Sequence, residues 1–261
     1  MEWWLTDRSR LAVLVIACAL LLSMEALVPL FRYRPGRLRR ALPNVVLAFG
    51  VVLVNLAFAS LMASLSGVVV RNNFGLLSGM RLHSWVLLVV GVAGLDLFAY
   101  VAHFLLHKMS VGWRFHRVHH SELEVDVTTA FRQHPGETMW RVLWQGLGIA
   151  VFGLPFWIVP LYLSISSLNA LLEHANLKMS HRLDRWLRLL IVTPNMHKIH
   201  HSCLVAETDS NYSNIFSLWD RLFATHTAWT EYRNLRYGLN GFDNDRKQGL
   251  IELMSEPFRF S

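Results

Sequence analysis

Long runs of hydrophobic residues, separated by short polar segments, dominate the first two thirds of the chain. Residues 11–31 and residues 44–70 are each long enough to cross a bilayer as a helix. A third run covers roughly residues 83–107, and its last turns carry two histidines. Because few charges interrupt these three runs, each predicts a transmembrane helix.

The fourth apolar run, residues 142–172, differs because Gly153, Pro155 and Pro160 lie inside it. Proline removes a backbone donor and clashes with the preceding turn, so one straight helix is costly here. The run therefore predicts a helical hairpin or a re-entrant pair. The whole pattern predicts an all-α integral membrane protein with about four transmembrane helical segments.

The remaining segments, residues 108–141 and 173–261, are polar enough to lie in water. We expect them to pack together as a cytoplasmic helical cap on the membrane helices. The chain is thereby divided into N-terminal transmembrane helices with a basic loop, a domain that carries the histidine motifs, and a loosely packed C-terminal tail. These parts cover residues 1–82, 83–230 and 231–261.

Composition agrees with a lipid environment. Hydrophobic residues make up 53% of the chain and charged residues 16%, so apolar surface remains for lipid. The net charge is +7, but the basic residues are spread among loops without a nucleic-acid motif, which excludes nucleic acid as a partner. Cys18 and Cys203 lie far apart, so we expect neither a disulfide framework nor a CxxC metal site.

The loops predict an orientation. Five arginines lie in residues 32–40, between the first two apolar runs, and by the positive-inside rule this loop is cytoplasmic. The N-terminus then lies outside, and the third run returns to the cytoplasm at His107, so every histidine motif lies on the cytoplasmic side. We expect no cleaved signal, because Glu2 and Asp7 dilute the positive charge and no small-residue cleavage motif follows.

The histidines are clustered rather than scattered. Two lie four residues apart at the end of the third run, and two further motifs each hold three with the spacing i, i+3, i+4. On a helix this spacing places the rings on one face, close enough to share a metal ion. Thr193 and Pro194 precede the last motif as an N-cap and a first-turn proline, so a helix is expected there. The motifs are His103/His107, His116/His119/His120 and His197/His200/His201.

So many imidazoles exceed the four ligands of a structural zinc and suit two metal ions with open positions. Imidazole binds zinc, copper, iron and nickel alike, so the ligand type leaves the metal open. The HExxH motif of zinc proteases is absent. A transition-metal transporter is the alternative function, although its ligands would lie near the bilayer midplane rather than at the ends of apolar runs. A bis-histidine haem protein fits less well, because two motifs contain adjacent histidines.

Further motifs surround the histidines, namely Asp126–Glu137, His174–Asn176, Asn211–Tyr212 and Trp219–Phe223. Together with the order HxxxH, HxxHH and a distant HxxHH, they are similar to the fatty acid hydroxylase superfamily, and in particular to its bacterial sterol-desaturase-like branch. The resemblance covers about residues 90–226.

The resemblance implies a membrane-bound di-iron oxidoreductase of the bacterial inner membrane. Such an enzyme uses O2 and electrons from a separate donor protein, a ferredoxin, cytochrome or reductase, to hydroxylate or desaturate a C–H bond of a lipid. The implied substrate is a sterol-like or fatty-acyl lipid, and zinc can replace the two iron ions on purification. The implied metal ligands are the eight motif histidines, His103, His107, His116, His119, His120, His197, His200 and His201, and in addition His174.

Other polar side chains are candidates for supporting roles in catalysis. Asp96 lies seven residues before His103 in an apolar run, where a carboxylate is costly. It is expected to be either a partner of a ligand histidine or a residue that packs helices or contacts lipid head groups. His134 is expected either to donate a hydrogen bond to the site or to cap a loop. Asp209 and Glu173 are further candidates for hydrogen bonding to ligand histidines.

Overall fold

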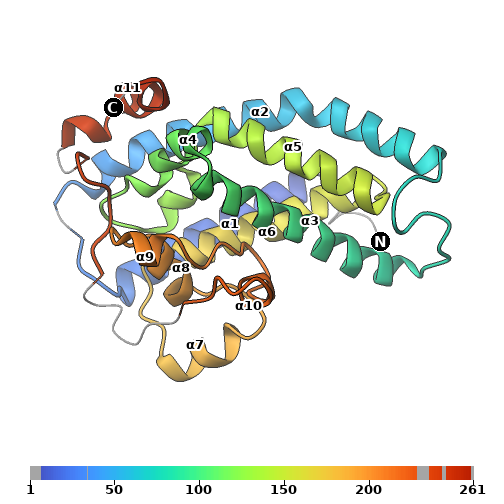
Figure 1. Ribbon diagram of the computed structural model, residues 1–261. Coiled ribbons are helices and arrows are strands. Elements are labelled where there is room, and N and C mark those ends of the chain that lie inside the picture. Colours follow the sequence, from blue (N-terminus) through green and yellow to red (C-terminus); the bar gives the residue numbers. More distant parts are fainter. Residues whose placement is uncertain (1–6, 34, 228–234, 243–244, 260–261) are drawn as a thin grey trace.

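The computed structural model describes residues 7–33, 35–227, 235–242 and 245–259. Within these ranges the regular structure is helical, as the sequence predicts. Five long helices of the described residues form a bundle (Figure 1). They are α1 (Asp7–Leu27), α2 (Arg37–Arg71), α3 (Ser84–Lys108), α5 (Pro135–Phe152) and α6 (Ile158–His174).

Shorter helices gather at one end of this bundle, on the left of Figure 1. Short helices and loops, rather than long parallel helices, therefore surround the end of the bundle at which α3 and α6 finish. The short elements are α4 (Ser110–His120), η2 (Val127–Phe131), α7 (His181–Leu187), α8 (Pro194–His200), α9 (Val205–Thr208), α10 (Leu218–Leu222), η4 (Asp245–Gln248), α11 (Leu250–Ser255) and η5 (Glu256–Phe258).

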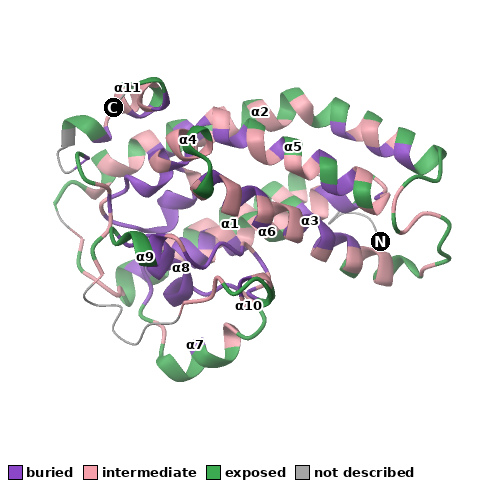
Figure 2. Ribbon diagram, in the orientation of Figure 1, coloured by how far each residue is buried: buried purple, intermediate pink, exposed green. Residues whose placement is uncertain are grey.

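Three helices are long and apolar enough to cross a membrane, over Arg8–Leu27, Arg37–Arg71 and Ser84–Lys108. Large hydrophobic residues such as Leu27 and Leu38 are exposed on them, and Figure 2 shows how much of α1 and α2 is not buried. Apolar surface of this extent is stable in lipid and not in water, so the chain is a membrane protein. The first three predicted runs are thereby confirmed as apolar helices.

The second helix begins earlier than the apolar run that predicts it. The run starts after Pro43, but α2 begins at Arg37 and includes the proline in its second turn. Pro43 lacks the N–H that would bond the carbonyl of Arg39, so the first turn has one backbone hydrogen bond fewer to the rest of the helix. Ion pairs hold this first turn in place, because Arg37 pairs with Asp126 at 3.1 Å and Arg40 pairs with Glu124.

The fourth apolar run is divided into two helices. Gly153 ends α5 with a φ of 73°, a left-handed conformation that glycine adopts without steric cost. α6 begins at Ile158, so Pro155 lies in the connecting turn and Pro160 in the first turn of the helix, where a missing N–H costs little. α5 begins at Pro135, before the apolar run, because the His134 side chain caps the first turn and proline is favoured at the first helical position. That α5 and α6 enter the membrane stays a prediction.

The main hydrophobic core lies between α2, α3, α5 and α6. It includes Met62, Leu95, Ile149 and Ile158, all of which are buried. A second cluster joins α1 to α6 and η2. Within a bilayer, close van der Waals packing of these side chains holds the helices together, because lipid tails are as apolar as the core.

One buried carboxylate joins α1 to the end of the bundle that carries the short helices. Glu25 is fully buried in the last turns of α1. It accepts hydrogen bonds from the backbone amides of Val127 at 2.8 Å and Asn176 at 2.7 Å, and it pairs with Arg37. Since buried donors are costly to leave without an acceptor, this carboxylate fixes α1, α2, η2 and the segment after α6 relative to one another.

The described part of the C-terminal tail packs against α4, so the expectation of a loose tail is wrong for this part. Leu253 is fully buried against Val118. Gln248 accepts a hydrogen bond from Arg132 and donates one to the carbonyl of Ser121 at 3.0 Å. The tail has no long apolar run, so its packing depends on a tertiary surface that the sequence does not display.

We predict that Gly153→Ala destabilises the protein more than Gly79→Ala does. Both glycines are left-handed, with φ of 73° and 76°, so the strain on a new side chain is similar, about 1 kcal/mol. A Cβ at Gly153 would lie 2.6 Å from the carbonyl oxygen of Phe74, whereas at Gly79 it would meet nothing within 4 Å. The clash should add about 1–3 kcal/mol. Tryptophan fluorescence during heating in detergent measures this, and equal midpoints would contradict it.

Candidate metal centre

Helix ends carry the histidines. His103 and His107 occupy the last two turns of α3, and His174 is the last residue of α6. The helix expected at the last motif is α8: the Thr193 hydroxyl accepts a backbone N–H at 3.2 Å and Pro194 lies in the first turn. A cap and a proline therefore set where this helix begins and how its histidines point.

The structure brings the nine predicted histidines together in two groups, and within each group the ligand nitrogens lie within 4.8 Å of one another. The side chains of both groups are buried. The first histidine group consists of His103, His107, His116, His120 and His200. The second histidine group consists of His119, His174, His197 and His201.

Each HxxHH motif contributes to both groups, although the sequence predicts three rings on one helix face. Successive residues of a helix are about 100° apart, so the i and i+4 positions stay together while i+3 and i+4 diverge. The i and i+4 histidines accordingly join one group, and the i+3 histidine joins the other. On α4, His116 and His120 belong to the first group and His119 to the second. In the α8 motif, His197 and His201 belong to the second group and His200 to the first.

The Nε2 atoms within a group face one another at distances that suit ligands of one metal ion. In the second group, the Nε2 atoms of His119 and His197 lie 3.1 and 3.0 Å from Nε2 of His174. In the first group, Nε2 of His103 lies 3.0 Å from Nε2 of His116. Nitrogens bound at about 2.1 Å to a single ion are separated by roughly 3.0–3.4 Å.

Backbone carbonyl groups contact the outer nitrogens of several rings. A carbonyl oxygen only accepts hydrogen bonds, so the contacted Nδ1 atom carries the proton and Nε2 is left with its lone pair. This tautomer is assigned from the hydrogen-bond network. The pairs are His103 with Tyr212 at 2.8 Å, His200 with Ser210 at 2.7 Å, His119 with Arg132 at 3.2 Å and His174 with Ala170 at 2.7 Å.

His119 and His174 illustrate why this arrangement fits a cation. Both rings carry their proton on Nδ1, so their Nε2 atoms, 3.1 Å apart, are both acceptors. Two lone pairs that face each other in a buried site repel, and no hydrogen bond can form between them. A metal ion between the nitrogens replaces the repulsion with coordination, and imidazole donors suit iron as well as zinc, copper and nickel.

Burial keeps these histidines neutral. It lowers the pKa of His119, His120, His197 and His201 well below the usual value, and the charges that neighbouring histidines would carry lower it further. Burial likewise lowers the pKa of His200 to about 3. A neutral ring is the form that binds a metal ion, so protons do not compete for these donors at neutral pH.

Asp209 and Glu173, two of the acids expected from the sequence, lie beside the groups. Asp209 Oδ1 lies 3.3 Å from Nδ1 of His107, and Oδ2 accepts a hydrogen bond from Lys108 at 2.7 Å. Glu173 Oε1 lies 3.8 Å from Nε2 of His197. Negative charge on Asp209, at 3.3 Å from Nδ1 of His107, offsets part of the charge of an ion held by neutral imidazoles. The catalytic roles of both residues stay predictions.

Glu137 is a further partner, which the histidine motifs alone do not indicate. It is fully buried in the first turn of α5, and its Oε1 lies 3.0 Å from Nδ1 of His116. The same oxygen accepts a hydrogen bond from Nε of Arg141, one turn later, at 2.8 Å. In the sequence, Glu137 could have been singled out because it directly follows His134-Pro135-Gly136 and is four residues before Arg141, a spacing that favours an ion pair on a helix.

Asp96 and His134 have packing contacts rather than contacts with a group. Asp96 is fully buried and accepts two backbone N–H bonds, at 2.9 and 3.1 Å, and one from the indole of Trp219 at 2.9 Å. It anchors the segment before α10 to α3, and within the described residues its hydrogen bonds reach no histidine. His134 caps α5 and lies 3.3 Å from the carbonyl of Met254. The contacts of Asp96 fit the helix-packing role, and those of His134 fit the capping role.

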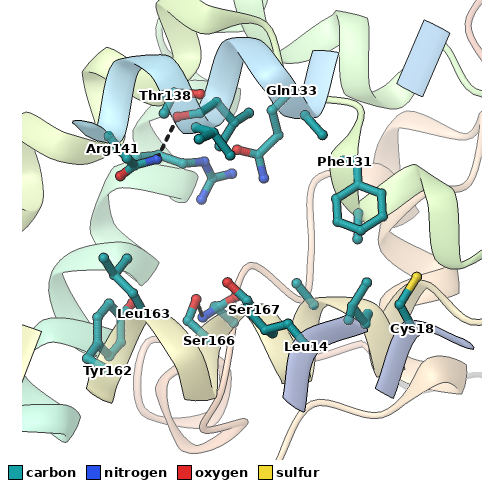
Figure 3. Close-up of a pocket in the computed structure, with 18 of the residues that line it drawn as sticks. Leu14, Cys18, Phe131, Gln133, Thr138, Arg141, Tyr162, Leu163, Ser166 and Ser167 are labelled. Atoms are coloured by element: carbon teal, nitrogen blue, oxygen red, sulfur yellow. Dashed lines mark hydrogen bonds between the residues drawn. The ribbon is translucent and has the colours of Figure 1, made fainter. Parts of the chain in front are cut away.

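A cavity of about 660 Å³ lies beside the histidine groups, lined mainly by α1, α2, α5 and α6 (Figure 3). Most of its lining is apolar, as at Leu14. Its wall also includes Thr138 and Arg141, which follow Glu137 on α5. Ala170, whose carbonyl contacts His174, lines it from α6. The cavity wall therefore contacts the second histidine group at His174 and is linked to the first group through the pair formed by Arg141 and Glu137, which lies beside His116.

Comparison with protein families gives a match to the fatty acid hydroxylase family over residues 88–225, more than half of the chain. Ornithine lipid hydroxylase of Rhizobium tropici is 29% identical over 173 residues, 65% of this chain and 50% of that protein. Human alkylglycerol monooxygenase is 27% identical over 207 residues, which are 78% of this chain and 44% of that protein. The alkylglycerol monooxygenase of Xenopus tropicalis is 28% identical over 158 residues, 60% of this chain and 33% of that protein. The chain thus spans half or less of these curated relatives. No solved structure matches it.

We predict that the metal-free protein loses stability as the pH falls from about 7.5 to about 5.5. The pKa of a histidine in the unfolded chain is about 6.5, whereas that of His200 in the folded protein is about 3 and that of His201 is also well below the usual value. Below about pH 6.5 the unfolded chain therefore binds more protons, and the unfolding free energy falls by up to roughly 1.4 kcal/mol per pH unit for each such histidine.

Heating scans in detergent after chelation measure this pH dependence. Protein reloaded with Zn²⁺ is the control, because the bound ion must be displaced before its ligands protonate, so its midpoint should fall only at lower pH. A midpoint of the metal-free protein that does not change over this range would contradict the prediction.

Proposed function

Because this chain belongs to the fatty acid hydroxylase family, we propose that it is a membrane-bound di-iron oxidoreductase that uses O2 and electrons from a separate donor protein to hydroxylate a C–H bond of a lipid. The observation that carries the proposal is the pair of histidine groups beside a largely apolar cavity. The relatives are named as a lipid hydroxylase and as monooxygenases, which are activities of this type.

Each histidine group would hold one iron ion. The first group offers five imidazole nitrogens and the second offers four. Iron suits such donors, and unlike zinc it changes oxidation state, as O2-dependent hydroxylation requires. Bound iron supplies the redox chemistry by which O2 is activated.

The protein's own groups would orient these donors and connect them to water. The carbonyl groups of Tyr212 and Ser210 fix the rings of the histidines they contact, as described above. Asp209 contacts His107 while its side chain is 33% exposed. It is therefore the group through which the proton on Nδ1 of His107 would exchange with solvent.

The lipid would reach the centre through the cavity. Leu11, Val15 and Val52 line the cavity and are also exposed, by 62%, 58% and 53%. All three lie on helices that are apolar enough to cross a membrane. An apolar chain or ring system can therefore enter from the bilayer without passing through water, which supports a fatty-acyl or sterol-like substrate.

We place the centre on the cytoplasmic side of a bacterial inner membrane, with the N-terminus outside. Arg37 and Arg40 of the basic segment pair with Asp126 and Glu124, which follow α4. These ion pairs support an arrangement in which the basic segment and the histidine groups lie at the same end of the bundle. The positive-inside rule assigns that end to the cytoplasm, where a soluble electron donor can bind.

The alternative expectation, a transition-metal transporter, is not favoured. Transporter sites lie near the bilayer midplane within broken helices. The histidines here come from the ends of α3 and α6 and from the short helices α4 and α8. The relatives of this chain described above are also named as a lipid hydroxylase and a monooxygenase rather than as transporters.

We expect protein expressed with iron-57 and purified without O2 to contain about two iron ions per chain by metal analysis and Mössbauer spectroscopy. His200→Ala removes a donor of the first group and His201→Ala one of the second, so each should lower the iron content by up to about one ion per chain. His83→Ala is the matched control, because His83 is exposed and belongs to neither group. Folded protein without iron, or with zinc that O2 does not affect, would refute the proposal.

The reaction itself is tested in the membranes of expressing cells supplied with isotopically labelled O2. We expect mass spectrometry to find a lipid that has gained one labelled oxygen atom in cells with the unmodified protein and with His83→Ala. Cells with His200→Ala should lack this product, because the first group is incomplete. Identical lipid profiles in all three would count against hydroxylation.

A further inference from the structure

Arg141 places a cation inside the largely apolar cavity. It lies on α5, and Figure 3 shows its guanidinium directed into the cavity. Oε1 of Glu137 accepts a hydrogen bond from Nε of this guanidinium at 2.8 Å, and Nη2 lies 2.8 Å from the same oxygen as part of the ion pair. Within the described part of the chain, Glu137 is the only residue with a hydrogen bond or ion pair to it.

The guanidinium has hydrogen-bond donors to spare. It carries five N–H groups in a rigid fork; the Glu137 carboxylate accepts a hydrogen bond from the Nε–H group and lies beside Nη2. At least three N–H groups are left for whatever fills the cavity. Charged donors without acceptors are costly in a site of low dielectric constant, so an occupant that brings an oxygen acceptor is favoured over a plain hydrocarbon.

Glu137 contacts Arg141 through a single oxygen, Oε1, which also lies 3.0 Å from Nδ1 of His116. The remaining N–H groups of the guanidinium can form a charge-assisted hydrogen bond to an oxygen of a bound molecule. The same geometry places Arg141 one carboxylate away from a member of the first histidine group.

Several polar groups of the cavity lining lie near Arg141, together with Leu163, and apolar groups predominate farther away, together with Gln133. Thr138 precedes Arg141 by three residues on the same face of α5, and Ser166 of α6 lies across the cavity from it in Figure 3. Leu14 of α1 and Phe131 lie toward the other side of the same view. This division suits a molecule with a polar group at one end and a hydrocarbon part at the other.

We propose that Arg141 binds a hydrogen-bond-accepting oxygen of the substrate lipid, either a free carboxylate or the carbonyl of an acyl group. The bound oxygen then lies close to the first histidine group, and the carbons next to it, rather than the far end of the chain, are presented for oxidation. The binding step stands by itself, whereas the position of oxidation rests on the proposed function.

Binding is tested on iron-loaded protein kept without O2 in dodecyl maltoside, a detergent without carbonyl groups. A palmitic acid analogue with a photoreactive diazirine beside its carboxyl group labels the protein, and mass spectrometry locates the label. Palmitic acid, methyl palmitate and hexadecane serve as competitors of matched chain length. We expect labelling of α5 or α6 peptides around Arg141 and Ser166, with competition by an oxygen-bearing probe and not by hexadecane.

Substitution of Arg141 separates the two oxygen sources. Arg141→Gln should weaken competition by about tenfold or more, and Arg141→Lys by less, because lysine keeps the charge and loses the fork. A loss confined to palmitic acid assigns a carboxylate, and an equal loss for methyl palmitate assigns a carbonyl. Arg71→Gln is the matched control, since Arg71 is exposed at the end of α2, and it should leave competition unchanged.

The proposal is overturned if Arg141→Gln leaves the competition by both oxygen-bearing probes unchanged, or if hexadecane competes as well as they do. Iron content and unfolding temperature report whether the variant is intact, and Arg141→Lys carries the test if Arg141→Gln loses iron. Because binding is measured without O2, a positive result together with a lack of oxidised product would refute the proposed function and leave the lipid site standing.

Discussion

Imidazole lone pairs that face each other 3.1 Å apart in a buried site, at His119 and His174, are the constraint on which the rest of the structure depends. Without a cation they repel, and protonation would replace that repulsion with one between like charges. The backbone carbonyl groups of Tyr212 and Ser210 hold the protons on the outer nitrogens of two further rings. The site therefore combines donors that are neutral, oriented and ready for a metal ion.

The two histidine groups depend on each other because they use the same two helices. α4 and α8 each supply both groups, so a shift of either helix would disturb all the donors together. The surroundings hold α4 firmly: Arg132 donates to the carbonyl of Val118 at 2.9 Å and also binds Gln248 of the C-terminal segment. Buried polar contacts of this kind are costly to leave half satisfied, which makes the position of the helix well defined.

The long helices and the short helices have different roles, and the two parts of the structure are in contact at the cavity wall formed by α5 and α6. The long helices present apolar surface and enclose a largely apolar cavity. The short helices and loops place the nitrogen donors and carboxylates at the end of the bundle. α5 and α6 belong to both parts, since Ala170 faces the cavity and contacts His174, and Glu137 joins Arg141 to His116.

The sequence by itself determined the features that depend on neighbours along the chain. The apolar runs predict three helices that can cross a membrane, Thr193 and Pro194 predict the start of α8, and the spacing of the motifs predicts that His103 and His107 share a group. Helix formation, capping and i, i+4 contacts are local, so they can be inferred from residue types and spacing.

Only the tertiary structure decided which faces of different helices meet. It separated His119 from its motif partners, placed Glu137 beside His116, and packed the tail at Leu253 against α4. It also turned Asp96 toward a loop rather than toward a histidine. These contacts join residues far apart in the chain, and their energies depend on burial and on the direction of side chains, which spacing along one helix does not specify.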